Sequence, residues 1–122
     1  MHYVKILSAE PAKIRVTNLE RTLIDIALRP YYSGGVEKVL DAYKLALGSV
    51  NVTQLAEYLT QLNYVYPFHQ AIGWYMEKAG YSDKQLKPFR SQSKLRLFYL
   101  THKMQNPILD TAWKIFVPSH IV

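Results

Sequence analysis

Glycine and proline divide the chain into short stretches in which apolar residues recur every three to four positions. That spacing predicts amphipathic helices, and the residues between the stretches predict where each helix ends. The first stretch begins at Thr17-Asn18-Leu19-Glu20, the pattern of a capping box in which Thr17 and Glu20 exchange hydrogen bonds. The helix should end before Pro30, because the residue preceding proline disfavours helical geometry. We therefore expect a first helix from residue 18 to residue 27 or 28.

The same reasoning predicts up to four more helices after a short Gly34-Gly35 loop, over residues 36–47, 51–62, 66–79 and 83–89. Gly48 and Gly80 suit the positions that follow the second and the fourth of these five helices. The third and the fifth begin with pairs spaced for capping, Asn51 with Gln54 and Ser82 with Gln85.

Strands are expected at both ends of the chain, where the sequence looks extended and residues 13–17 and 95–100 alternate with a period of two. They cover residues 4–7, 13–17, 95–100 and 111–117, and Asn106-Pro107 breaks the chain between the last two. The order of N-terminal strands, four to five central helices and C-terminal strands predicts an α+β fold with a mostly antiparallel sheet. A length of 122 residues is that of one ordinary domain, so residues 1–122 are expected to form a single domain.

The net charge of +6 is concentrated near the C-terminal end. Between Lys78 and Lys103 there are seven bases and one acid, Asp83, whereas eight bases balance eight acids elsewhere. Such asymmetry is typical of a surface that binds a polyanion, although a solvated face without a ligand accounts for it equally well. The bases that we expect to contact nucleic acid or a protein partner are Lys87, Arg90, Lys94, Arg96 and Lys103. Ten tyrosines favour an aromatic rim around the core, with a stacking platform for bases as the alternative.

Patterns that carry catalysis or bind a cofactor are scarce. There is no cysteine, the four histidines are too far apart for metal-ligand spacing, and no phosphate-binding glycine loop occurs. No apolar run is long enough to span a bilayer, and no signal peptide is apparent, so a cytoplasmic protein without cofactor, metal or membrane partner is expected. Glu37 and Asp41 share a helix face and leave a divergent nuclease as the weaker alternative to a protein that acts by binding.

The stretch from Val16 to Asp25 followed by Arg29-Pro30-Tyr31-Tyr32-Ser33-Gly34-Gly35 is the most specific part of the sequence. It resembles the signature of the C-terminal domain of AbiEi-family antitoxins, also described as transcriptional regulators, with Asn18 in place of the usual aspartate. The stretch Ile72-Gly73-Trp74-Tyr75-Met76-Glu77-Lys78-Ala79-Gly80 is similar to a second block of that family. The resemblance covers roughly residues 13–89.

The resemblance implies an antitoxin or regulatory domain of a type IV toxin–antitoxin, or abortive infection, system of bacteria. Its partner would be a nucleotidyltransferase-like toxin, which it need not bind in a stable complex, and it would contribute to DNA binding. Members of the family carry an N-terminal winged-helix domain, which we expect to be absent here because the signature begins at Val16. A stand-alone, non-specific nucleic-acid-binding domain that uses the basic residues is the alternative.

The signature residues are expected to be structural. Arg21 and Asp25 are spaced for an ion pair on one helix face, and with Arg29 they would hold the first helix against the Gly34-Gly35 turn. The alternative is that Arg21 or Arg29 faces a partner. The full set of signature positions is Thr17, Glu20, Arg21, Thr22, Asp25, Arg29, Pro30, Gly34 and Gly35.

Overall fold

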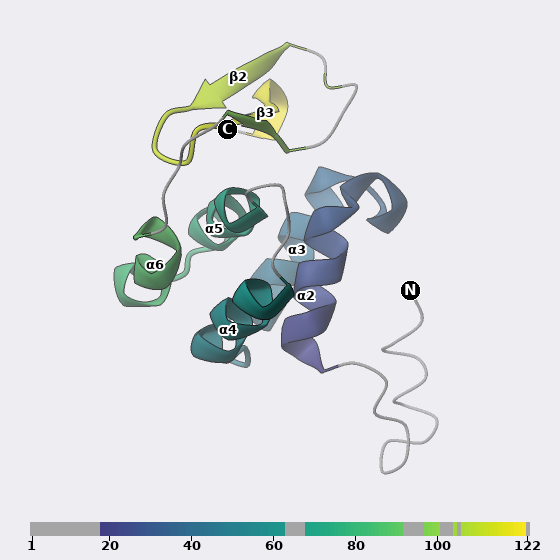
Figure 1. Cartoon of the computed structure of the whole chain (residues 1–122). Helices are drawn as coiled ribbons and strands as arrows, with labels where there is room; N and C mark the ends of the chain where they lie inside the picture. Colours follow the sequence, from purple (N-terminus) through teal and green to yellow (C-terminus); the bar gives the residue numbers. More distant parts are fainter. Residues whose placement is uncertain (1–17, 63–67, 92–96, 101–103, 105, 122) are drawn as a thin grey trace.

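The computed structural model describes residues 18–62, 68–91, 97–100, 104 and 106–121 (Figure 1). Its five α-helices are followed by a three-stranded sheet, which confirms the α+β class. The helices are α2 (Leu19–Leu28), α3 (Val36–Ala46), α4 (Val52–Leu62), α5 (Phe68–Lys78) and α6 (Asp83–Arg90). The strands are β1 (Phe98–Tyr99), β2 (Pro107–Asp110) and β3 (Ile115–Pro118), and the 3-10 turns are η1 (Pro30–Ser33) and η2 (Ser119–Ile121). The strands expected over 4–7 and 13–17 lie outside the described residues.

The start of α2 corrects the first capping prediction. The cap is Asn18, whose backbone is extended and whose Oδ1 accepts a hydrogen bond from the Arg21 N–H at 3.0 Å. Thr17 is therefore not the cap and itself lies outside the described residues. Glu20 does not complete a capping box either, because its Oε2 accepts from the Asn51 N–H at 2.7 Å, at the start of α4. Helix α2 does end at Leu28, before Pro30, as predicted.

The other helix ends follow the sequence closely. The side chain of Asn51 accepts from the Gln54 N–H at 3.0 Å. Ser82 and Gln85 form a capping box at the start of α6, in which each side chain accepts from the other residue's backbone N–H. Both predicted caps are confirmed, because capping depends on residues three positions apart and needs no distant contact.

The sheet differs from the prediction in its strand bounds. Strand β3 pairs antiparallel with β2 over four residue pairs and parallel with β1 over two, so antiparallel pairing predominates. A strand over 111–117 is wrong: Thr111–Lys114 form a turn, in which the Asp110 Oδ1 accepts from the N–H groups of Ala112 and Trp113. The chain does bend at Asn106, where φ is 48°, as expected, but an additional strand was missed: Pro107 begins β2, an edge strand that tolerates a missing N–H.

Figure 1 shows the sheet at one end of the helical layer and α4 at the other, with α5 next to the sheet. The core runs through both parts, and its largest fully buried side chains include Trp74, Trp113, Tyr43, Tyr75 and Phe89. The rings of Tyr43 and Tyr75 stack with centroids 5.3 Å apart and join α3 to α5. None of the described helices is both long and apolar enough to cross a bilayer.

Candidate functional site

The buried part of the signature builds the corner from α2 through η1 to α3. Glu20 and Thr22 are buried on α2, and Pro30 is buried at the first position of η1. Gly34 and Gly35 have φ angles of 94° and 97°, a region that favours glycine. The Gly35 N–H donates to the Pro30 carbonyl at 2.7 Å, which closes the turn and directs the chain into α3. Pro30, Gly34 and Gly35 therefore determine the path of the backbone between α2 and α3.

The charged part of the signature is arranged differently. Arg21 and Asp25 are four positions apart on one side of α2, and Arg29 follows four positions later as the residue that caps the C-terminal end of the helix. Arg21 and Asp25 are half-buried and Arg29 is exposed. Within the part of the chain that the structure describes, the Arg21 and Asp25 side chains form neither an ion pair nor a hydrogen bond with each other or with the Gly34-Gly35 turn. We refer to these three residues as the α2 stripe.

The Arg21 side chain also contains a hydrogen-bond donor that lacks an acceptor. Its Nε is buried and has no hydrogen-bond partner. A shielded N–H without an acceptor costs free energy in the folded chain. The charge of Arg21 is thus not used to stabilise the described fold, and no contact of Asp25 or Arg29 points to such a use.

Of the five bases that the sequence analysis selected, the structure describes only Lys87 and Arg90, both on α6. Lys87 is exposed, as are Lys78 and Lys84 nearby in the sequence. Arg90 instead makes an ion pair with Glu77 of α5 at 3.0 Å, and its guanidinium lies 5.3 Å from the centre of the Trp113 ring. Lys94, Arg96 and Lys103 lie outside the described residues, so whether the five bases form one surface stays a prediction.

Trp113 joins the sheet to the helices through contacts with Gln70, Gly73 and Glu77 of α5 that were not predicted from the sequence. We refer to these contacts as the Trp113 seat. The ring of Trp113 lies directly on Gly73 of α5, where an added Cβ would come within 2.3 Å of the ring. Its Nε1 donates to Glu77 Oε1 at 2.7 Å, and its carbonyl accepts from Gln70 Nε2 at 2.7 Å. Partial burial would raise the pKa of the Glu77 carboxyl, but hydrogen bonds from Trp113 and Arg90 outweigh it and lower that pKa below its usual value.

The sequence did contain a signal for this seat. Gly73 stands inside a helical stretch, where glycine is unfavourable and marks a close approach of another group. Glu77 follows four positions later on the same face of α5, which places its carboxylate beside the same ring. The approaching group itself lies 40 positions away in the sequence, so the pattern did not identify Trp113.

Three tyrosines in the core donate or lack hydrogen bonds in ways that favour a structural role. The Tyr43 hydroxyl donates to the Leu23 carbonyl at 2.8 Å, and the Tyr81 hydroxyl donates to the Tyr43 carbonyl at 2.9 Å. Burial raises the pKa of Tyr43 and Tyr75, and it raises the pKa of Tyr81 to about 12. The Tyr43 and Tyr81 hydroxyls therefore link α2, α3 and the residue before the cap of α6, whereas the buried Tyr75 hydroxyl has no hydrogen-bond partner among the described residues and contributes by its stacked ring.

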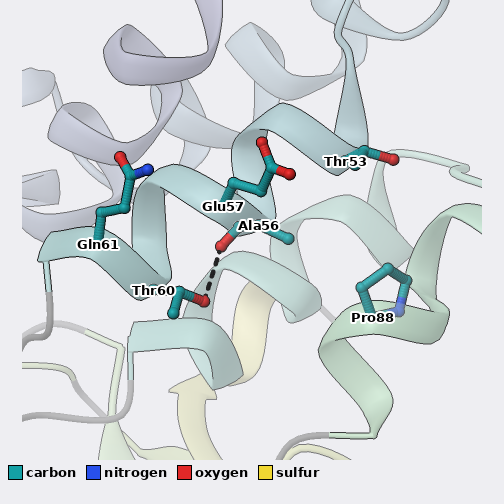
Figure 2. Close-up of a pocket in the computed structure, with 6 residues that line it drawn as sticks. All are labelled: Thr53, Ala56, Glu57, Thr60, Gln61 and Pro88. Atoms are coloured by element: carbon teal, nitrogen blue, oxygen red, sulfur yellow. Dashed lines mark hydrogen bonds between the residues drawn. The ribbon is translucent and has the colours of Figure 1, made fainter.

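The carboxylates on which the nuclease alternative rests, Glu37 and Asp41, are both exposed on α3. Glu37 pairs with His120 at 3.3 Å on the surface. Among the described residues, no group of three or more histidine and acidic side chains is placed to hold a metal ion. A shallow depression of about 470 Å³ lies between α4 and α6 (Figure 2). Its lining residues are Thr53, Ala56, Glu57, Thr60, Gln61 and Pro88.

Comparison with family models, with curated proteins and with solved structures found no match to this chain. The structure defines an α+β domain. Polar side chains such as Glu20 and Glu77 form hydrogen bonds that join one secondary-structure element to another. The exceptions are the α2 stripe and the exposed bases Lys84 and Lys87 of α6.

Proposed function

We propose that the chain is the antitoxin domain of a type IV toxin–antitoxin system and neutralises a nucleotidyltransferase-like toxin in the bacterial cytoplasm by binding rather than by catalysis. The proposal rests on the resemblance of residues 16–35 to the AbiEi signature and on one structural observation. That observation is the α2 stripe, whose three charges have no ionic partner within the described chain.

The two parts of the signature support the proposal in different ways. Pro30 and the two glycines fix the corner, and Glu20 links α2 to the start of α4, so the contacts of these residues explain them as structural. The same cannot be said of Arg21, Asp25 and Arg29, because charged side chains that stabilise a fold do so through partners. Two cations that flank one anion form a pattern that a partner with the opposite arrangement would recognise.

The test is a growth rescue in cells that co-express this chain and its candidate toxin, a nucleotidyltransferase-like protein that the proposal expects to be encoded beside it. We expect the wild-type chain to restore growth. The double variant Arg21→Gln/Arg29→Gln should fail to restore it while its unfolding midpoint stays within about 2 °C of wild type, as for surface substitutions. Asp25→Asn should weaken rescue in the same way.

The matched control is Lys44→Gln, which removes an exposed cation from α3 away from the stripe and should rescue fully. Full rescue by the Arg21→Gln/Arg29→Gln variant would contradict a partner-facing stripe. A large drop in its unfolding midpoint would instead support the structural role for the signature arginines. Failure of the wild-type chain to rescue growth would argue against the antitoxin assignment itself.

A further inference from the structure

The outer face of the C-terminal sheet carries a row of exposed apolar side chains. Tyr99 of β1 and Leu109 of β2 both lie opposite Phe116 of the central strand β3, so the three share one face. Ile115 and Val117 alternate with Phe116 and are buried. The row therefore points away from the helices, and Tyr99 is 56% exposed and Leu109 40% exposed.

Within this row the ring of Tyr99 is held in a fixed orientation. It stacks on Phe116 with ring centroids 4.5 Å apart and an angle of 17° between the ring planes. A tyrosine that is ordered by a neighbouring ring and still largely exposed has a free aromatic surface. Bases of single-stranded nucleic acid stack on surfaces of this kind on sheet faces, whatever the base.

The net charge of the C-terminal segment of the sequence favours a polyanion over a second copy of the chain as the ligand. Residues 91–122 contain four bases and one acid. These are Lys94, Arg96, Lys103 and Lys114, against Asp110. The Asp110 carboxylate already accepts two backbone hydrogen bonds in the turn before β3, and Lys114 in that turn is exposed. A second copy of the chain would bring the same positive excess, whereas a phosphate backbone neutralises it.

We propose that this sheet face binds single-stranded nucleic acid. A base stacks on the exposed ring of Tyr99, and Phe116 and Leu109 support that ring from the same face of the sheet. Lys114 lies two residues before Phe116 and supplies a cation for the phosphate backbone. The site lies on a different part of the molecule from the α2 stripe and does not depend on the antitoxin assignment (Figure 1). It also differs from the basic surface expected from α6, because it reads bases by stacking.

The test is fluorescence anisotropy with the whole chain at low salt. The probes are an oligouridylate and an oligothymidylate of about 12 nucleotides and a duplex of equal length. We expect the chain to bind at least one single strand more tightly than the duplex, in which the bases are not accessible for stacking. Tighter binding of oligouridylate would identify RNA as the ligand. Equal binding of the two single strands would mean that the site accepts RNA and DNA alike.

Tyr99→Leu should weaken this binding about tenfold, because it keeps an apolar side chain but removes the ring. Tyr99→Phe should retain it, which separates stacking from folding. Lys114→Gln should lower the slope of log Kd against log salt by about 0.7. The matched control is Tyr31→Leu, which removes an exposed tyrosine in η1 and should bind as wild type does.

Three results would overturn the proposal. The first is equal affinity of Tyr99→Leu and wild type for single strands. The second is binding of the duplex at least as tight as that of the single strands. The third is a chain that binds no oligonucleotide; if that chain self-associates in sedimentation and Tyr99→Leu does not, the face belongs to a second copy of the chain.

Discussion

The corner formed by α2, η1 and α3 and the seat of Trp113 are held by contacts of different range. In the corner, the turn depends on residues close in sequence, such as Pro30, whose carbonyl accepts from the Gly35 N–H five positions later. The Trp113 seat depends on hydrogen bonds that span 36 positions to Glu77 and 43 positions to Gln70. Short-range contacts close the corner, whereas long-range contacts attach the sheet to the helices.

This difference bears on where a substitution acts. A change at a helix end removes one hydrogen bond and leaves the rest of the helix intact. A change in the Trp113 seat acts on packing, two hydrogen bonds and an ion pair at once, because all of them meet around one ring. The seat should therefore be the more sensitive of the two regions.

The largest effect is expected from Gly73→Ala. The added Cβ would lie 2.3 Å and 2.4 Å from two atoms of the Trp113 ring, closer than any real contact, so the ring must move. Overpacking of this kind costs about 3 kcal/mol, which exceeds the roughly 1 kcal/mol that alanine gains over glycine in a helix. Thermal unfolding should show a midpoint about 10 °C lower.

A double-mutant cycle makes that prediction specific. In a Trp113→Leu background the ring is gone, so Gly73→Ala should be neutral or should stabilise by about 1 kcal/mol through helix propensity. The same loss in both backgrounds would mean that Gly73 matters for a reason other than the ring. A Gly73→Ala variant more stable than wild type would mean that the Trp113 seat is not more sensitive to substitution than the corner.

A smaller effect is expected from Glu20→Ala. Glu20 is 8% exposed and accepts from the Asn51 N–H at 2.7 Å, so it links the first turn of α2 to the start of α4. Its removal leaves that N–H without its acceptor and should cost about 1–2 kcal/mol in denaturant unfolding. Glu20→Gln keeps an acceptor oxygen and should cost less. If Glu57→Ala, on the exposed side of α4, costs as much as Glu20→Ala, the link between the helices is not what Glu20 provides.

The two regions also differ in how far the sequence predicted them. The ends of α2 at Leu28, of α4 at Asn51 and of α6 at Ser82 follow from neighbouring residues, and the structure confirms them. Glu20 was assigned to a local box because its spacing allowed one, yet its acceptor binds a residue 31 positions away. Local pattern does not say which of two possible partners a side chain takes.

The sheet shows the same limit more strongly. A strand was expected over residues 111–117, but the Asp110 carboxylate accepts backbone hydrogen bonds that fold the first half of that stretch into a turn. The turn is what brings Trp113 onto Gly73, and neither contact is encoded in a window of a few residues. For the α2 stripe, the spacing of Arg21, Asp25 and Arg29 was evident from the sequence, whereas the lack of partners emerged only from the packed structure.

The smallest effect, and the one that tests the electrostatics of the seat, is the pH dependence carried by Glu77. Its pKa is lowered in the folded chain, so between the folded and unfolded values the unfolded state binds more protons. The resulting stability is fully present above a pH of about 4.5, the usual value for the carboxyl, and is lost as pH falls through the folded-state pKa. Because the side chain is 37% exposed, the contribution should be at most about 1 kcal/mol.

Unfolding midpoints of wild type and Glu77→Gln, measured from pH 7 down to pH of about 3, should therefore differ most at neutral pH and converge in acid. Ser82→Ala is the control, because it removes an uncharged cap of α6 and should lower the midpoint by a similar amount at every pH. A Glu77→Gln curve that runs parallel to wild type would mean that the carboxylate charge adds nothing to the seat. Trp113 would then be held by packing on Gly73 and by hydrogen bonds that a neutral amide makes equally well.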